Sequence, residues 1–174
     1  MDIWGLGAAR SLIQLANDPL SIDRVVAKYL PYFTFSIGKV SIDAKMFAIS
    51  KTAMNVCRDV AHDPSGGNLL FKNKIIYRPV FSDGNKIVIA PEIDSILKLP
   101  VILGLSCCMN QASQNQTWAQ RIRPCKWCQR FFVCKTDRGS KFCSLDCRTT
   151  EKNNRKRAGA PVNEGIGTPF TRGN

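Results

Sequence analysis

Apolar residues recur every three or four positions in three stretches near the start of the chain, the spacing typical of amphipathic helices. The first stretch covers residues 6–16. The second runs from Ser21, which could cap a helix, to about Leu30. The third begins near Ser41, another candidate cap, and continues to about Val60. The chain is therefore predicted to open with three helices whose apolar faces can share one core.

The pattern changes to that of a β-hairpin after a break rich in Pro, Ser and Gly at residues 64–68. Residues 75–81 and 86–90 are rich in Ile, Val and aromatic residues, which favour strands. The Asp-Gly turn signal at residues 82–85 joins these two runs. Because Pro79 cannot donate a hydrogen bond to a neighbouring strand, the first strand is predicted to lie at an edge of its sheet.

An apolar run after the hairpin predicts a further helix. Pro91 and Glu92 are typical of a helix start, and the apolar pattern continues to about Met109. A bend is expected at Pro100, because proline removes a backbone donor inside a helix. The most apolar part of this run is too short to span a bilayer. The next residues, 111–117, are polar and rich in amides, which indicates a helix end or a linker.

Four cysteines stand in two close pairs, Cys125-x2-Cys128 and Cys143-x3-Cys147, separated by a gap of fourteen residues. Four thiolates are the number that closes a tetrahedral structural zinc site, and a closed site has no open position for a reactive water. The sequence therefore predicts one structural Zn²⁺ bound by Cys125, Cys128, Cys143 and Cys147.

The residues around these cysteines predict the element order of a treble-clef zinc finger. Residues 123–128 are expected to form a short strand and a zinc knuckle. Residues 131–133 continue as a strand, and residues 136–139 are expected to form a hairpin turn. Ser144 could cap a helix that carries Cys147 in its first turn. In so short a segment, the metal would supply most of the folding free energy.

These elements predict an α+β protein with three parts. Residues 1–117 form a helical N-terminal domain with a β-hairpin, and residues 118–157 form the treble-clef zinc finger. Residues 158–174 are rich in Gly and Pro and are expected to be a disordered tail. The helices and hairpin of the first part supply their own apolar faces, so we expect it to fold without zinc.

The other cysteines and the single histidine are assigned simpler roles. Cys134 fits neither close pair and is predicted not to bind the metal. Cys57, Cys107 and Cys108 lie in apolar helical patterns and are expected to be core residues. His62 follows the predicted third helix and is expected at the surface. The metal-like spacing, together with the lack of a basic segment ahead of the first apolar stretch, favours a soluble cytoplasmic protein.

Positive charge is concentrated at the C-terminal end of the chain. The formal net charge is +12, and residues 121–174 hold 13 Lys and Arg against 4 Asp and Glu. A basic module beside a zinc site points to nucleic acid, although a cationic surface kept only for solubility is the alternative. The residues predicted to bind nucleic acid are Arg148, Lys152, Arg155, Lys156 and Arg157 on the last helix, with Lys126 and Arg130 near the knuckle.

Two motifs and the order of the upstream elements carry a family resemblance. Residues 125–132 have the pattern Cys-x2-Cys-x3-Phe, and residues 142–147 have the pattern Phe-Cys-Ser-x2-Cys. The module resembles the zinc finger of the CGNR family, and the upstream order resembles that family's ABATE domain. The Gly-Asn-Arg of the family signature is absent, because Arg-Thr-Thr follows Cys147. The resemblance implies a bacterial transcriptional regulator.

Three functions remain open at the level of sequence. The first is a regulator that binds duplex DNA, with an N-terminal domain that senses a small molecule or forms a homodimer. The second is an adaptor for other proteins, with a purely structural zinc, and the third is an RNA-binding factor. We find no convincing catalytic triad, phosphate loop or carboxylate pair, so an enzyme is not expected. No residue in the sequence identifies a small molecule that the N-terminal domain would bind.

Overall fold

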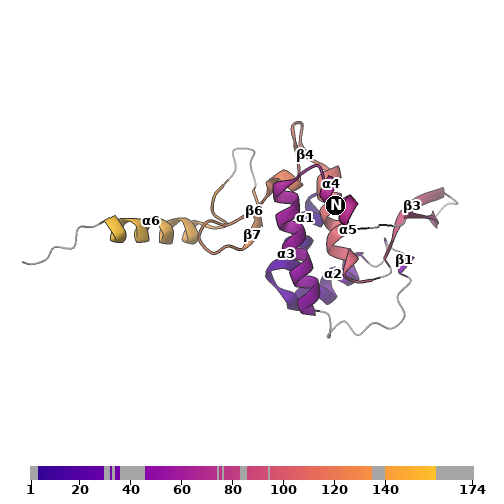
Figure 1. Cartoon of the computed structure of the whole chain (residues 1–174), viewed down its shortest axis with the longest axis horizontal. Helices are drawn as coiled ribbons and strands as arrows, with labels where there is room; N and C mark the ends of the chain where they lie inside the picture. Colours follow the sequence, from indigo (N-terminus) through magenta and orange to yellow (C-terminus); the bar gives the residue numbers. More distant parts are fainter. Residues whose placement is uncertain are drawn as a thin grey trace, which may run out of the picture.

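The computed structural model has an α+β architecture in which a helical body carries a sheet on one side and a projecting helix on the other (Figure 1). It describes residues 4–29, 32, 34–35, 46–73, 75, 77–82, 86–93, 95–134 and 140–159. Several expected features lie outside these residues: the cap at Ser41, both predicted hairpin turns in large part, and nearly all of the expected tail.

Three helices form the centre of the body. They are α1 (Leu6–Asn17), α3 (Met46–His62) and α5 (Lys98–Met109), and each packs against the other two. The first two are amphipathic, whereas α5 is buried continuously from Leu99 to Cys108. A helix that is apolar all round is typical of the centre of a core. Among the described residues, no helix is both long and apolar enough to cross a membrane.

Two short helices complete the body, and both refine the predicted elements. A 3-10 turn, η1 (Pro19–Ser21), precedes α2 (Ile22–Tyr29), so Ser21 is not the helix cap. Asp18 caps the turn instead, because its carboxylate accepts a hydrogen bond from the Leu20 N–H at 3.1 Å. The break predicted at residues 64–68 leads directly into α4 (Gly67–Lys72), a helix that the sequence pattern did not predict.

A three-stranded sheet has the order β1-β3-β2, so the strand that contains Pro79 lies at an edge, as predicted. Its strands are β1 (Thr34–Phe35), β2 (Tyr77–Ser82) and β3 (Lys86–Ile93). Strands β2 and β3 are antiparallel, with Pro79 opposite Ile89, whereas β1 and β3 are parallel. The predicted hairpin is therefore confirmed, and the strand β1 is added to it.

The predicted start of the apolar helix was wrong. Pro91 and Glu92 extend β3, where they pair with β2 and β1, and α5 begins only at Lys98. The first turn of a helix has no internal partners for its N–H groups. Pro100 lies in that turn, so its missing N–H interrupts no hydrogen bond and the expected cause of a bend is absent.

The polar segment after α5 is neither a helix end nor an unstructured linker. It forms a small antiparallel hairpin of β4 (Gln111–Ser113) and β5 (Gln116–Thr117), followed by a 3-10 turn, η4 (Ala119–Arg121). The sequence pattern missed these strands because they are short, polar and lack a buried face.

The C-terminal part of the fold starts with strands that pack on the helical body. Strand β6 (Ile122–Pro124) contacts α3, and β7 (Phe131–Val133) contacts α1. Asn17, the last residue of α1, donates to the Phe131 carbonyl at 2.8 Å and accepts from its N–H at 3.2 Å. These contacts cross the predicted boundary at residue 117, and independent folding of the two parts stays a prediction.

Candidate metal centre and basic helix

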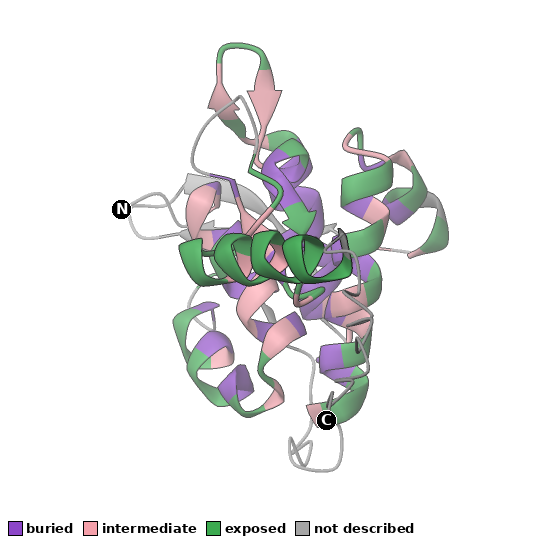
Figure 2. Ribbon diagram, turned by 90° about the vertical axis from the view of Figure 1, so that its left-hand side faces the viewer, coloured by how far each residue is buried: buried purple, intermediate pink, exposed green. Residues whose placement is uncertain are grey.

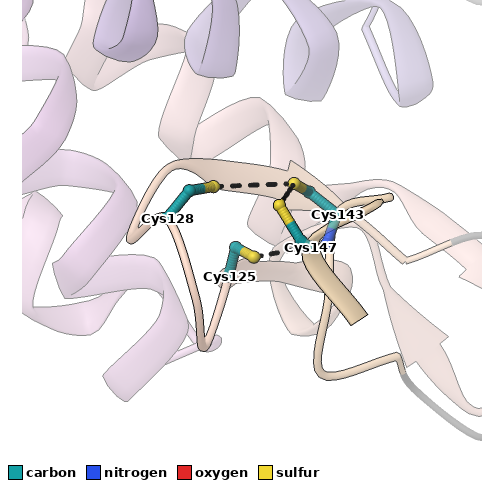
Figure 3. Close-up of side chains that lie close together, drawn as sticks. All are labelled: Cys125, Cys128, Cys143 and Cys147. Carbon is teal, nitrogen blue, oxygen red and sulfur yellow. Dashed lines mark hydrogen bonds between the residues drawn. The ribbon is translucent and has the colours of Figure 1, made fainter. Parts of the chain in front are cut away.

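The four paired cysteines come together in one cluster (Figure 3). All four Sγ atoms lie within 4.8 Å of one another. The Sγ of Cys143 is 3.6 Å from that of Cys128 and 3.5 Å from that of Cys147. Four thiolates around one tetrahedral zinc at about 2.3 Å would stand roughly 3.8 Å apart, so the cluster has the dimensions of a four-thiolate site. The group could therefore hold one metal ion.

The first pair lies on the tight turn between β6 and β7. The Cys125 N–H donates to the Arg130 carbonyl at 2.9 Å, and the Gln129 N–H donates to the Cys125 carbonyl at 3.0 Å. Gln129 takes a left-handed backbone conformation with φ of 60°, which glycine or asparagine usually supplies. These bonds close the turn and direct both thiols to the same side, as Figure 3 shows.

The second pair lies at the start of α6 (Leu145–Gly159). The predicted cap is confirmed, because the Ser144 hydroxyl accepts a hydrogen bond from the Cys147 N–H at 3.2 Å. Cys147 is in the first turn of the helix, and the N-terminal end of a helix stabilises negative charge. The predicted order of a strand, a knuckle and a second strand is also observed. Strand β7 pairs with β6 across the knuckle. Residues 140–142, which lead to Cys143, are not in a strand.

The surroundings of Cys125 and Cys143 shift the pKa values of these two thiols in opposite directions. Burial raises the pKa of Cys125, but N–H groups of Cys128, Cys143 and Trp127 donate to its sulfur and bring the pKa down to about 6. The Cys143 N–H, for example, lies 3.5 Å from that sulfur. Local desolvation of the Cys143 sulfur and its hydrogen bonds with the neighbouring cysteine sulfurs raise the pKa of Cys143 to about 12. Without a metal, the thiolate form is therefore favoured at Cys125 over Cys143.

The remaining cysteines lie where the sequence predicted them. Cys134 is outside the four-sulfur cluster and buried, and its thiol donates to the Ser140 carbonyl at 3.6 Å. Cys57, Cys107 and Cys108 belong to the hydrophobic core. Burial raises the pKa of the Cys57 thiol well above its usual range. His62 is exposed at the end of α3.

The predicted nucleic-acid-binding residues are all exposed. Five of them lie along α6, which projects from the body and is exposed along almost its whole length (Figures 1 and 2). The other two, Lys126 and Arg130, lie on and just after the knuckle turn. The cationic helix thus carries the last cysteine of the cluster in its first turn, and Lys126 of the knuckle turn lies beside it.

Glu151 is a residue of this region that the sequence analysis missed. Its carboxylate lies 3.4 Å from the Lys126 Nζ and also forms an ion pair with the Arg155 guanidinium one helical turn away. The Glu151 side chain is only 16% exposed, and its contact with Lys126 shows that it lies on the side of α6 that faces the knuckle. The spacing of Glu151 and Arg155 is a recognisable i,i+4 signal, whereas the contact with Lys126 depends on the fold.

Comparisons with known proteins add no family assignment. No protein-family model matches the chain, and no match was found among curated proteins. The function must therefore be argued from the metal centre and its surroundings.

Proposed function

We propose that this protein is a zinc-dependent nucleic-acid-binding protein that recognises duplex DNA as a transcriptional regulator. The observation that carries the proposal is an exposed cationic helix that begins at a four-cysteine cluster. A metal fixed at the first turn would orient that helix relative to the knuckle, and the helix would present its cations to phosphates.

Zinc is the metal that best suits this donor set. Soft thiolates favour zinc over the hard cations that prefer oxygen ligands, and a closed four-thiolate set suits a structural site. In this role the four cysteines hold the knuckle against the start of α6, and the ion supplies folding free energy. A treble-clef finger of the CGNR type is the form that we propose for this module.

The cations of α6 differ in how available they are for phosphate. Arg155 is held by Glu151, whereas no ion-pair partner is found among the described residues for the other four, Arg148, Lys152, Lys156 and Arg157. Arg148 and Lys152 are one helical turn apart and offset by about 100° and 140° from Cys147, so they point away from that cysteine. This face of α6 is the proposed phosphate-binding surface.

The salt dependence of binding tests the proposal. Fluorescence anisotropy of labelled duplex DNA and RNA should be followed with the zinc-loaded protein from low to high salt. If about five phosphates are contacted, the plot of log affinity against log salt should have a slope of roughly −4 to −5. The double variant Arg148→Gln/Lys152→Gln should weaken binding and make the slope shallower by about 2.

The matched control is Lys51→Gln/Arg58→Gln, which removes the same charge from exposed positions of α3. It should change the slope little, and zinc content should be the same in all three proteins. Tighter binding to RNA than to duplex DNA would favour the RNA-binding factor. Absence of salt-sensitive binding in a fully zinc-loaded protein would refute the proposal and favour the adaptor.

A further inference from the structure

A cavity of about 490 Å³ lies at the junction between α1 and the segment that leads into the metal centre. The wall from α1 includes Leu6, Arg10, Ile13 and Gln14, and the facing wall includes Trp118, Arg121 and strand β7. The volume is within the range of small-molecule sites in proteins, roughly 300 to 1,000 Å³. The cavity is separate from the exposed face of α6.

Much of the lining is apolar. Leu6 and Ile13 line the cavity from α1, and Phe131, Phe132 and Val133 line it from β7. Phe131 is almost fully buried against the core, whereas Phe132 and Val133 are only partly buried. A ligand that covers these side chains removes apolar area from water, which favours binding. These side chains suit an aromatic or aliphatic body.

The lining also carries positive charge. Arg10 is exposed on α1, and no ion-pair partner for it is found in the part of the chain that the structure describes. The Arg121 guanidinium lies 5.4 Å from the centre of the Trp118 ring. The described lining residues include no carboxylate. An anionic group would therefore be attracted to Arg10.

Trp118 lines the cavity and can report on its occupancy. Its indole Nε1 is buried without a hydrogen-bond partner among the described residues, so that atom does not face the open cavity and is not expected to bond directly to a ligand. The ring of an aromatic acid bound beside Trp118 would instead change the chemical shift of the indole N–H.

We propose that this cavity binds a small organic acid, with the apolar body against β7 and the acidic group toward Arg10. The proposal goes beyond nucleic-acid binding and does not depend on it. The chemical class follows from the lining: apolar side chains for the body, and the Arg10 guanidinium for one carboxylate.

The test uses the zinc-loaded full chain, labelled with ¹⁵N, and two ligands of the same shape. The ligands are 2-naphthoate, which is anionic, and 2-naphthamide, which is neutral. The indole N–H signals of the three tryptophans are resolved by NMR, and the Trp118 signal is assigned with Trp118→Phe. Titration with 2-naphthoate should shift the Trp118 signal saturably while those of Trp4 and Trp127 stay in place. Because charged hydrogen-bond partners bind more strongly, 2-naphthamide should bind at least about 10-fold more weakly.

Arg10→Gln should reduce the affinity for 2-naphthoate and leave 2-naphthamide nearly unchanged. The matched control is Arg24→Gln, at an exposed position of α2 outside the cavity lining, which should bind both ligands as the unaltered protein does. Zinc content and the thermal unfolding curve establish that each variant is folded. The proposal is overturned if Trp118 does not respond at millimolar 2-naphthoate, if the acid and the amide bind equally, or if Arg10→Gln has no effect.

Discussion

Single residues define the metal centre, and the two pairs of cysteines contribute in different ways. Cys125 is fully buried and receives N–H donors, while Cys143 is exposed and shares its surroundings with two other sulfurs. Cys134 lies only one residue after β7, yet its thiol is directed to the Ser140 carbonyl. Nearness in sequence is therefore a poor guide to membership of the four-sulfur cluster, whereas the close pairing of the cysteines is a good one.

Substitution of single cysteines should separate ligands from bystanders. Cys143→Ser removes one of four thiolates, so the purified protein should retain less than one zinc per chain and lose it readily to a chelator. Cys134→Ser should keep one zinc per chain, because its sulfur lies outside the cluster. Metal analysis by mass spectrometry measures both. Full zinc in the Cys143→Ser protein would contradict the assignment of that ligand.

Glu151 forms ion pairs with two of the cations that were predicted to bind nucleic acid, Lys126 and Arg155. Glu151→Gln removes one negative charge and releases Lys126 and Arg155 from their ion pairs. We expect unchanged zinc content, tighter binding to duplex DNA and a log–log salt slope steeper by about 1. Asp23→Asn, at an exposed position of α2, makes the same change in charge elsewhere and is the control. Weaker binding by a zinc-loaded Glu151→Gln protein would instead show that the carboxylate holds the two cations in productive positions.

At the scale of elements, the structure depends on the close approach of α5 to its neighbours. Gly104 is the point of contact: a Cβ atom added there would overlap the Val56 side chain of α3 and lie 3.1 Å from the Leu69 Cδ1 of α4. A helix would otherwise gain stability from alanine at this position, by about 1 kcal/mol. We expect the lack of space to outweigh that gain, so that an added Cβ atom destabilises the fold, because overpacking a close-packed core costs about 1–3 kcal/mol.

Gly104→Ala should therefore lower the free energy of unfolding, by up to about 2 kcal/mol after the helix-propensity gain is subtracted. Urea unfolding of the zinc-loaded protein, followed by circular dichroism, measures the change. Gly67→Ala is the matched control, because its added Cβ would meet the Ser65 Oγ at an ordinary 3.5 Å. Equal or higher stability of the Gly104→Ala protein would mean that α3 and α5 can move apart at little cost.

The elements show which parts of the fold the sequence could predict. Helical periodicity identified α1 and α3 because each has one apolar face, and the Asp-Gly signal identified the β2–β3 hairpin. The boundary between β3 and α5 was misplaced because Pro91 and Glu92 are common at helix starts, and only pairing with β1 and β2 makes them strand residues. The hairpin of β4 and β5 has no apolar alternation to reveal it.

The candidate site could be predicted from the sequence only in part. The four cysteines and the cap at Ser144 were predictable, because close spacing and local capping determine them. The contact of Lys126 with Glu151 could not be predicted, since it joins the knuckle to a helix and depends on how the chain folds between them. The cavity was not predictable either, because its walls are more than 100 residues apart in sequence.

At the scale of the whole molecule, the helical body and the metal centre share core residues. Ala119, Ile122 and Phe131 lie beyond the predicted boundary at residue 117 but belong to the hydrophobic core of the helices. Burial of Ile and Phe side chains stabilises a fold by about 1.5–3 kcal/mol each. The body should therefore be weakened when this segment is removed, even if the helices still fold without zinc.

Two fragments test this division in the presence of a chelator. A fragment that ends at Thr117 should unfold cooperatively, but at a lower urea concentration than a fragment that ends at Cys134, which keeps β6 and β7. Circular dichroism measures both transitions. A random-coil spectrum for the shorter fragment would show that the helices and the strands form one interdependent core.

The contact between Asn17 and Phe131 has a consequence for synthesis of the chain on the ribosome. The two residues are 114 positions apart, and a ribosome adds about 5–20 residues per second. The end of α1 therefore emerges roughly 6–23 seconds before the strand that binds its amide. During that interval α3 is the earlier partner for α1, since the Ser50 hydroxyl reaches the Ala16 carbonyl. The helical body can thus begin to assemble first, and β6 and β7, which flank the first pair of cysteines, can then pack against it.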